Sequence, residues 1–404
     1  MGRFLVMDVV FYGSSLNYDQ GSGNYQELKK ITRWDGRQYT LVSRYALRYS
    51  MLNDTGIFGQ DELAPGNVFT KDTGEKSKGD VFNPKPETLF NGEILKYPEF
   101  DLFGYLVTKS EPTQSRTAPV RISHAISMTP FYYDSHFNGN HWIAQRALKA
   151  GLTTKLEPNL FTTEEHHTYY LYTVVVDVDR VGRFSVFTVK KDDIELVKQL
   201  MTKKSEENGL IKGKMNLTLP NGNTIEVDVL IIPIHKPDDE ASKGKKGKGK
   251  QKEPVLYEIQ YDLGENIRKE RVLKLVGAVL ELTRNIKGRS EKLKPKLLVL
   301  GIYKNKPYDT YKDRIELIDE YSEEEYDEIE EREENGKKVV RIKHMVSKSR
   351  KPIFGISGLS KGTSVENLSE SKVLSLVNKL VASKDEEISE VKVFKDPSVE
   401  VRIK

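Results

Sequence analysis

Alternating apolar and polar residues predict a buried strand over residues 4–12, near the start of the chain. Asp8 falls on the side opposite the main apolar row, so we expect this carboxylate at the surface or in a salt bridge. The same alternation predicts a strand over 119–128, one face of which carries a small polar row: Arg121, Ser123, Ala125 and Ser127. Shorter apolar segments predict three further strands, over 169–178, 255–261 and 297–303.

Two amphipathic segments predict helices that pack against these strands. Ser43 has the chemistry of an N-cap, and Leu47 with Met51 marks the apolar side of a short helix. A longer helix is predicted near 266–285, where apolar residues recur at helical spacing. With insertions removed, the order is strand, helix, strand, strand, helix, strand. This order predicts an α+β fold of the RNA-recognition or ferredoxin-like (split βαβ) type, whose sheet leaves one face free for a ligand.

Long insertions interrupt this predicted core. We expect the core to comprise four segments: 1–52, 118–128, 168–183 and 255–304. Residues 53–117 and 129–167 are too long for ordinary connections, so both are predicted as large insertions. A third insertion, 184–254, is predicted to hold a hairpin around Asn221-Gly222 and a mobile, Lys/Gly-rich loop at Lys243–Lys252.

Charge is distributed unevenly along the chain, whose formal net charge is +4. The C-terminal part, 305–404, holds an acidic block and elements that we expect beside the core. From Asp313 to Glu334 there are 13 acidic and 2 basic residues, a local charge of −11, which leaves +15 for the rest of the chain. That basic remainder favours a nucleic-acid partner. For the acidic block we favour a solvated helix over a contact with a basic neighbouring subunit.

Composition and missing motifs narrow the function classes. The chain has no cysteine, which excludes disulfides and thiolate chemistry and fits a reducing cytosol. Because no apolar run is long enough for a secretion signal or a membrane span, we expect a cytoplasmic protein with no membrane partner. Nucleotide-binding fingerprints are absent as well, so no cofactor is expected. The spacing of His136, His141 and His166 matches no metal site, and we expect no metal.

Arginines near the predicted short helix fit a polyanion. Arg44 and Arg48 lie one turn apart, and Arg44 lies in the first turn, where a bound phosphate interacts favourably with the helix dipole. Since arginine binds phosphate bidentately and also stacks, Arg116 and Arg121 join them as candidates. Surface arginines that reach carboxylates remain the alternative for Arg44 and Arg48.

Weaker candidates have equally simple structural explanations. Asn24 and Gln26 either bond a sugar or phosphate or cap a turn, and Lys29 with Lys30 adds positive charge beside them. A second possible anion site lies around Gly182, just past a predicted strand. It is flanked by two arginines, Arg180 and Arg183. Ordinary turn chemistry is the alternative there.

Several motifs resemble one known family. They are Gly23-Asn24-Tyr25-Gln26, Val42-Ser43-Arg44, Ala46-Leu47-Arg48-Tyr49, Asp101-Leu102-Phe103-Gly104-Tyr105 and Ala118-Pro119-Val120-Arg121-Ile122-Ser123-His124-Ala125. Together they resemble the DevR family of CRISPR-associated proteins over nearly the first half of the chain. The resemblance implies a backbone (Cas-seven type) subunit of type I-B Cascade: a hand-shaped protein with an RNA-recognition-type palm, no catalysis, and copies that polymerise along the guide RNA (crRNA).

The resemblance also assigns roles to the insertions. It makes 53–117 the fingers and web, and 129–167 the thumb, which reaches the neighbouring copy and displaces a base. Phe131 and Tyr132 become candidates for stacking on bases, with a small core under the thumb as the alternative. The predicted RNA-binding set is Asn24, Tyr25, Gln26, Lys29, Lys30, Ser43, Arg44, Arg48, Arg116, Arg121, Ser123, Phe131, Tyr132, Arg180 and Arg183.

Partners follow from the same resemblance. They are crRNA, target DNA through the guide, further copies of the chain, the repeat-end capping subunit, the large PAM-reading subunit, the repeat-processing nuclease and a recruited helicase-nuclease. The alternative function is a metal-independent RAMP-type endoribonuclease that cuts repeat RNA, with His124 or His166 as general acid or base. His124 shares the apolar phase of its predicted strand, which favours a core histidine over a catalytic one.

Overall fold

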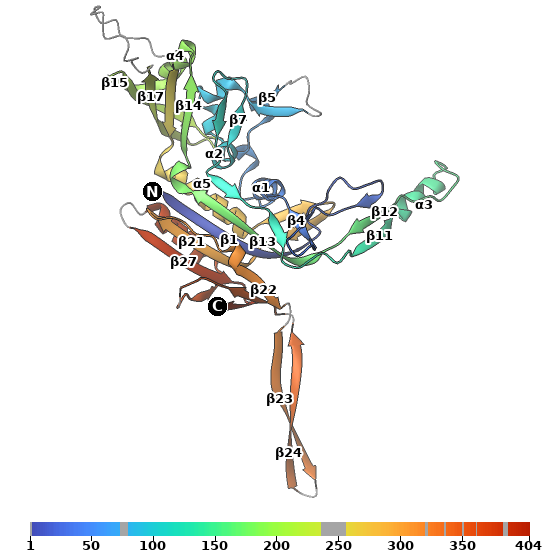
Figure 1. The fold of residues 1–404 in the computed structure, drawn as a ribbon. Helices are drawn as coiled ribbons and strands as arrows, with labels where there is room; N and C mark the ends of the chain where they lie inside the picture. The colour runs from blue at the N-terminus through green and yellow to red at the C-terminus, as the bar shows by residue number, and fades with distance from the viewer. Residues whose placement is uncertain are drawn as a thin grey trace, which may run out of the picture.

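The computed structural model describes residues 2–72, 80–235, 256–319, 322–334, 337–349, 351–360, 362–382 and 387–404. The predicted mobile loop at Lys243–Lys252 lies outside these residues. A central sheet forms the middle of the molecule, and three parts project from it: a second lobe, an arm and a long C-terminal hairpin (Figure 1).

The central sheet has nine strands in the order β26-β27-β21-β1-β13-β10-β4-β3, with β9 also paired to β13. The strands are β1 (Arg3–Ser14), β3 (Lys30–Thr32), β4 (Gln38–Val42), β9 (Val120–Ile122), β10 (Ala125–Ser127), β13 (His167–Asp177), β21 (Pro295–Lys304), β26 (Val365–Asn367) and β27 (Ile388–Lys395). β1 lies in the middle and runs antiparallel to both β13 and β21. The predicted strands at 4–12, 169–178 and 297–303 are therefore confirmed.

Three helices cover one face of this sheet: α1 (Arg44–Asn53), α5 (Gly264–Leu280) and α6 (Glu370–Ala382). Leu47 of α1, Val272 of α5 and Val377 of α6 join one core with Met7 of β1. The predicted helix near 266–285 ends earlier than expected. A short hairpin follows it, β19 (Thr283–Ile286) and β20 (Arg289–Lys292).

The opposite face of the sheet is not free, contrary to the prediction. A small sheet covers it, made of β22 (Ile315–Asp319), β25 (Ile353–Ile356) and β28 (Glu400–Ile403). Val10 of β1 is fully buried beneath it. A sheet that is covered on both faces cannot hold RNA across its middle, so a ligand must bind at its rim.

Asp8 illustrates the same burial. It is fully buried, and its carboxylate accepts hydrogen bonds from Thr173 Oγ1 at 2.5 Å and from the Tyr311 N–H at 2.7 Å. Burial raises the pKa of this carboxyl group. The expected surface position was wrong, because the C-terminal segment covers Asp8 and supplies one of its hydrogen-bond donors.

The predicted strand at 119–128 is broken at Ser123-His124. Ile122 pairs with Val174 and Ile126 with Leu171, so the register shifts by one residue between β9 and β10. The shift reverses the faces of the strand: Ala125 and Ser127 are buried, whereas Arg121 remains exposed. The predicted polar row therefore does not lie on one exposed face.

The second lobe combines two insertions that the sequence suggested were separate. Its five-stranded sheet has the order β14-β18-β17-β16-β15. The strands are β14 (Arg183–Thr188), β15 (Met201–Glu207), β16 (Leu210–Thr218), β17 (Thr224–Ile234) and β18 (Leu256–Asp262). The other elements are α4 (Lys191–Leu200), α2 (Pro98–Phe103), β5 (Phe69–Asp72), β6 (Val81–Pro84), β7 (Tyr105–Val107) and β8 (Gln114–Arg116).

One hydrophobic core holds this lobe together. Val107 from the first insertion packs with Phe184 and Val227 from the other. Ile259 of β18 joins the same core, although we expected 255–261 in the central sheet. The predicted hairpin around Asn221-Gly222 is confirmed as the turn between β16 and β17.

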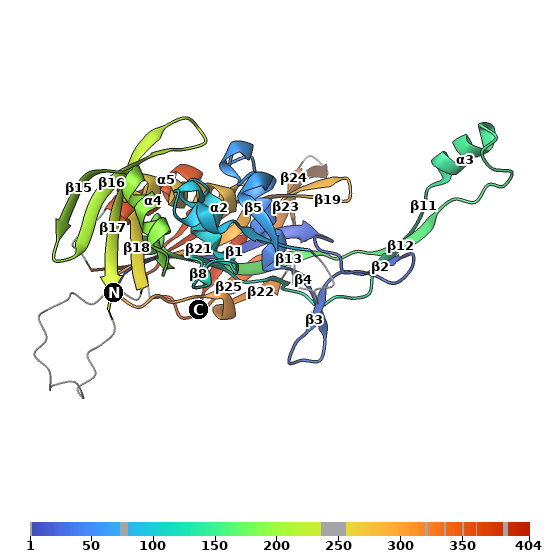
Figure 2. The ribbon, with the colours of Figure 1, turned by 90° about the horizontal axis from the view of Figure 1, so that it is seen from above.

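The arm extends away from the body in both Figures 1 and 2. It consists of β11 (Ser135–Gly139), α3 (His141–Lys149) and β12 (Leu160–Glu164), and β2 (Tyr25–Gln26) pairs with β12 at its base. No residue of α3 is buried, and Trp142 is 68% exposed. This amphipathic helix therefore has an apolar face without cover from its own described chain.

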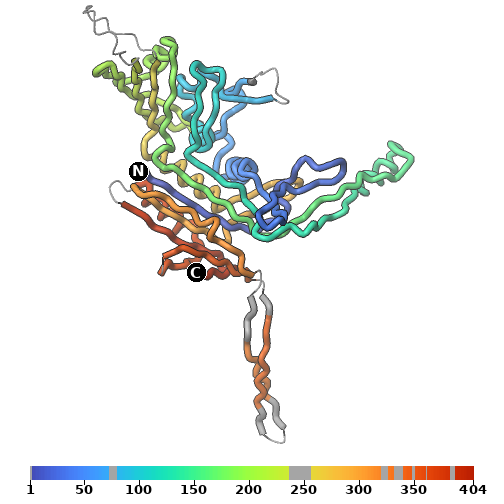
Figure 3. The backbone as a smooth tube through the Cα atoms, viewed as in Figure 1, coloured from blue at the N-terminus to red at the C-terminus, as the bar shows by residue number. Residues whose placement is uncertain are grey.

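The acidic block forms a strand, not the predicted helix. β23 (Ser322–Glu334) and β24 (Lys337–Ser349) make a long twisted hairpin that points away from the body (Figure 3). β23 carries nine acidic residues and one arginine, a charge of −8, and β24 carries five basic residues. Glu328 lies opposite Lys343, and Glu330 lies opposite Arg341. Opposite charges across the two strands favour pairing over a solvated helix.

Candidate nucleic-acid interface

Three of the predicted arginines come together at the rim of the central sheet. Arg44 and Arg48 of α1 and Arg121 of β9 line one hollow of about 390 Å³. We call it the arginine hollow. Its other lining residues are Tyr45, Phe103, Ala118, Val120 and Ile122. The hollow therefore combines cations with an aromatic and aliphatic wall, which suits phosphates and base faces together.

Within the described residues these guanidinium groups form no direct ion pair, although Glu99 interacts electrostatically with Arg48, and Asp177 with Arg121. Arg44 donates a hydrogen bond to the hydroxyl of Tyr45 at 2.9 Å, and Arg48 lies over the ring of Phe103 at 5.0 Å. Partial burial lowers the pKa of Arg48 from its usual value. In the part of the chain that the structure describes, no carboxylate oxygen lies within 4.0 Å of Arg44, Arg48 or Arg121. The alternative of arginines that reach carboxylates is thus not what the structure shows.

The first turn of α1 holds its own backbone donors. Ser43 caps the helix as predicted, since its Oγ accepts from the Ala46 N–H at 3.2 Å. The Arg44 N–H donates to Nδ1 of His124 at 3.0 Å. Two backbone donors of this helix end are therefore already occupied, so we expect side chains to make the main contacts with a phosphate in the arginine hollow.

His124 is an exposed helix-capping residue and not the core histidine that the strand phase predicted. Because its Nδ1 accepts a hydrogen bond, the neutral ring carries its proton on Nε2. Desolvation and the charge of Arg44 lower the pKa of His124, which favours this neutral form. Neighbouring Ser123 is also engaged in structure: its Oγ accepts from the Thr173 N–H at 2.9 Å.

His166 lies in a buried polar network at the base of the arm. Its Nδ1 lies 2.7 Å from Thr40 Oγ1, and its Nε2 lies 3.3 Å from Thr129 Oγ1. Burial lowers the pKa of His166 to about 4. Both ring nitrogens are occupied by threonine hydroxyls, so the geometry does not favour the endoribonuclease alternative at this residue. Among the described residues, no group of acidic and histidine side chains is placed to hold a metal ion.

Arg116 belongs to a buried ion cluster and does not line the arginine hollow. Its guanidinium contacts Asp101 at 2.5 Å, and Arg271 contacts the other oxygen of Asp101 at 2.7 Å. The Gly182 N–H donates to the same carboxylate at 2.9 and 3.0 Å. The anion predicted around Gly182 is therefore internal: the side chain of Asp101 occupies this turn. Because Asp101 is fully buried, the cluster has a structural role.

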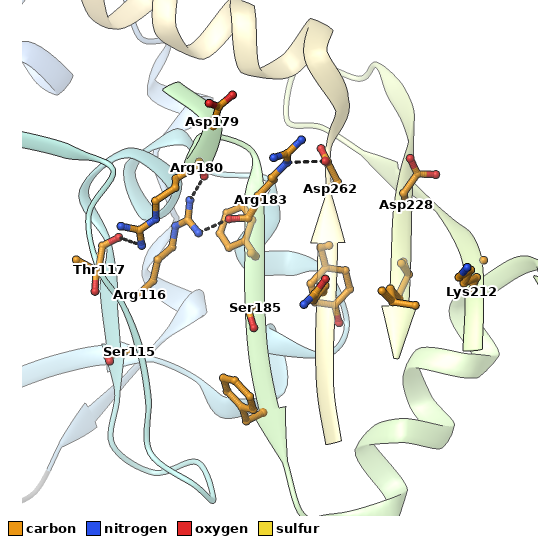
Figure 4. A pocket seen from close by; sticks show the side chains of 17 residues that line it. Ser115, Arg116, Thr117, Asp179, Arg180, Arg183, Ser185, Lys212, Asp228 and Asp262 are labelled. Atoms are coloured by element: carbon orange, nitrogen blue, oxygen red, sulfur yellow. Dashed lines mark hydrogen bonds and ion pairs between the residues drawn. The ribbon is translucent and has the colours of Figure 1, made fainter. Parts of the chain in front are cut away.

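Arg180 and Arg183 border a larger hollow of about 890 Å³ in front of the five-stranded sheet (Figure 4). Arg180 donates to the carbonyl of Thr117 at 3.0 Å, and Arg183 contacts Asp262 at 2.8 Å. Asp179 and Asp228 also line this hollow. Because this hollow is lined by both arginines and aspartates, we expect it to attract an anion less strongly than the arginine hollow does.

The candidates at the base of the arm have partners within the chain, and two of them contact Glu164. This buried carboxylate accepts from Lys30 Nζ at 2.7 Å and from the Tyr25 hydroxyl at 3.2 Å. Lys29 contacts Asp19 at 3.1 Å, and Lys287 donates to the side chain of Gln26.

The backbone carbonyl of Asn24 accepts from the Thr162 N–H at 2.9 Å. The contacts with Thr162 and Glu164 fasten the segment 24–30 to the arm, whereas Asp19 and Lys287 lie outside the arm. They are contacts with other parts of the chain, and not the turn caps that the sequence left open for Asn24 and Gln26.

The two aromatic candidates lie in different environments. Phe131 is only 4% exposed, with Lys30 Nζ 5.0 Å from its ring centroid and His166 packed edge-on at 5.6 Å. The small-core alternative holds for this residue. Tyr132 is 69% exposed and available for stacking. The sequence reasoning overlooked Trp34, which is the most exposed large apolar residue recorded; its position between Arg33 and Gly36 was the available signal.

The distribution of charge also differs from the one that the sequence suggested. The C-terminal hairpin carries −3 in total, so the rest of the chain carries +7, of which Lys243–Lys252 contributes +6. The remaining body is therefore nearly neutral. The positive charge that could attract an anion is local: it lies in the arginine hollow and does not extend over a basic surface.

The fold and the arginine hollow define an α+β protein with a cluster of arginines at the rim of its sheet. The chain belongs to the CRISPR-associated DevR/Csa2 family: the family model described as "CRISPR-associated negative auto-regulator DevR/Csa2" matches residues 5–326. The comparison with curated proteins gave no match.

Two solved structures have similar chains. One, from "CRISPR RNA-guided surveillance complex, pre-nicking", has a TM-score of 0.38 and 9% identity, over 76% of this chain and 80% of that chain. The other, from "CRISPR RNA-guided surveillance complex", has a TM-score of 0.25 and 11% identity, over 61% and 78%. Both scores are below 0.5, so the family assignment rests on the family model. No helix in the described residues is long and apolar enough to cross a membrane.

Proposed function

We propose that this chain is a noncatalytic, crRNA-binding backbone subunit of a type I-B Cascade complex, in which several copies hold one guide for pairing with target DNA. The observation that carries the proposal is the arginine hollow: Arg44, Arg48 and Arg121 converge from two elements, and none has a carboxylate oxygen within 4.0 Å among the described residues. Membership of a CRISPR-associated family gives this anion site its most direct ligand, the guide RNA.

The sheet order supports an RNA-recognition-type palm. The segment β21-β1-β13-β10 has the arrangement expected for a split βαβ unit, with α1 and α5 on one face. The covered opposite face moves the proposed RNA path to the rim, where α1 and β9 meet. This placement suits a protein that must accept any spacer, because guanidinium groups contact phosphates without reading bases.

The arm supports the proposed contact between copies. Trp142 and Ile143 of α3 and Leu152 beyond it are exposed together on a helix that no described residue of the same chain covers. Exposed apolar surface of this kind marks a protein contact. In our proposal the arm is the thumb, the second lobe forms the fingers, and α3 docks on the next copy along the guide. The other Cascade subunits named above remain proposed partners.

The decisive experiment is purification of the full chain from cells that express a matching CRISPR array. We expect guide-length RNA to copurify, and we expect an Arg44→Glu/Arg121→Glu variant to lose it, because both side chains are exposed and charge reversal repels phosphate. The matched control reverses two exposed cations that line none of these hollows, Lys190→Glu/Arg402→Glu. Equal RNA content in the two folded variants would contradict the proposed site, and RNA-free wild-type protein would contradict the function.

A further inference from the structure

Trp34 lies at the tip of the hairpin that joins β3 to β4, and its side chain is 92% exposed. The tip is held firmly around it. The carboxylate of Asp35 accepts from the Arg37 N–H at 3.0 Å, from Arg37 Nε at 2.8 Å and from the Tyr39 hydroxyl at 2.7 Å. A large aromatic side chain on a well-braced turn, outside every core, is arranged to contact something beyond its own chain.

A hollow of about 540 Å³ lies beside this hairpin, bordered by the β3–β4 tip, by the 123–128 segment and by the start of β22. We call it the tryptophan hollow. Its cations are Arg33, Arg37 and Lys312, and its acids are Asp35, Asp313 and Glu316. Two of these acids are already paired, since Asp35 contacts Arg37 and Glu316 contacts Lys404. Arg33 lies over the ring of Tyr39 at 5.0 Å. Among the described side chains neither Arg33 nor Lys312 has a carboxylate oxygen within 4.0 Å, although Lys312 interacts electrostatically with buried Asp8.

The tryptophan hollow adjoins the arginine hollow along one stretch of backbone. Ala118 and Val120–Ile122 line the arginine hollow, and Ser123, His124 and Ile126–Met128 line the tryptophan hollow. His124 stands at the junction, where its Nδ1 accepts from the Arg44 N–H and its neutral Nε2–H remains a donor. A strand of nucleic acid that leaves Arg44 and Arg121 therefore meets His124 and Trp34 next.

We propose that the tryptophan hollow binds one unpaired nucleobase of single-stranded RNA, stacked on the indole of Trp34, with the adjoining phosphate near Arg33 and Lys312. This inference rests on the proposed function and extends its site beyond the predicted residues. A base is the favoured occupant because the hollow offers an exposed aromatic face, a hydrogen-bond donor and two cations without a direct ion pair in the described chain, and because it continues the arginine hollow. A protein contact at Trp34 is the competing outcome.

The chain has only two tryptophans, so the Trp142→Phe variant of the full-length protein reports on Trp34 alone. We expect a single-stranded oligouridine RNA to quench this emission, with the same midpoint as its binding followed by fluorescence anisotropy. Trp34→Ala should weaken binding about 5- to 100-fold, and Trp34→Phe should restore much of it. An oligomer of abasic ribose phosphates should bind wild type and Trp34→Ala equally.

Each outcome separates the two claims. RNA that binds without quenching, with unchanged affinity for Trp34→Ala, would overturn the stacking site and leave the proposed function standing. No RNA binding by any variant would overturn the proposed function itself. Emission that changes on self-association without RNA would make Trp34 a protein contact and would also overturn the stacking site.

Discussion

The arginine hollow and the Asp101 cluster contain the same residue type, predicted from sequence as one set, in opposite environments. Arg48 and Arg121 face a hollow and have no carboxylate oxygen within 4.0 Å in the described chain, whereas Arg116 is buried in direct contact with Asp101, which also contacts Arg271. The difference shows that an arginine is available to a ligand only when the rest of the chain supplies no carboxylate for it.

The largest effect should come from breaking the buried side of this comparison. Asp101→Asn leaves two buried guanidinium groups without their anion, so we expect the free energy of unfolding to fall by about 3–5 kcal/mol. Chemical denaturation of the full chain measures this change. RNA affinity per folded molecule should not change.

The control for that experiment is an exposed pair. Asp309→Asn removes the partner of Arg314 at the surface, where a salt bridge contributes about 0–1 kcal/mol. If the two substitutions destabilised the protein equally, the Asp101 cluster would not have the structural role that its burial indicates.

The second-largest effect should come from acid, which should lower the free energy of unfolding through the buried His166. The pKa of His166 is about 4 in the folded protein and near 6.5 unfolded, so the unfolded state binds the proton more readily. Stability is therefore complete above pH 6.5 and falls as the pH drops toward 4, by about 3 kcal/mol in all. Unfolding curves between pH 7 and pH 4 measure this slope.

His166→Gln should flatten the pH dependence over that window, because glutamine does not titrate. The matched control is His136→Gln, an exposed histidine on the arm. A wild-type slope in the His166 variant would assign the acid sensitivity to other groups, among them buried carboxylates.

Two alanine substitutions compare the arginines directly. Arg48→Ala should weaken RNA binding about 10-fold or more, since it removes one charged contact, and should change stability little. Arg116→Ala should destabilise the protein and leave the affinity of the folded fraction unchanged. Anisotropy titrations at several salt concentrations measure both, and Arg48→Ala should reduce the log–log salt slope by about 0.7. If Arg116→Ala weakened RNA binding and Arg48→Ala destabilised the protein, the binding and structural roles that we assign to these arginines would be wrong.

The sequence predicted the local features well and the distant partners poorly. The Ser43 cap, the β1 strand and the turn at Asn221-Gly222 depend on neighbouring residues, and all three are present. Nothing local to Arg116 indicates that Asp101, 15 residues away, and Arg271, far along the chain, meet around it. The same applies to the covered face of the sheet, because its cover comes from the last hundred residues.

The acidic block was misread for a related reason. A run of glutamates predicts a solvated helix when it is considered alone, but β24 supplies lysines and arginine opposite it. Trp34 was missed because a single tryptophan in a turn has no periodicity. Its exposure became visible only once the fold placed the β3–β4 tip outside every core.

The smallest effect should come from removing the C-terminal hairpin. Because β23 and β24 largely neutralise each other, deletion of 322–349 changes the net charge by only +3. The hairpin also points away from the body that contains α1 (Figure 1). RNA affinity should then change less than about twofold, since screening limits charge effects beyond about 10 Å. A control deletion of the basic Lys243–Lys252 loop removes six lysines and tests whether a charged segment elsewhere alters binding. A large gain in RNA affinity on loss of the hairpin would mean that its acidic strand competes with RNA for the arginine hollow. The arginines would then pair with this strand when no RNA is bound.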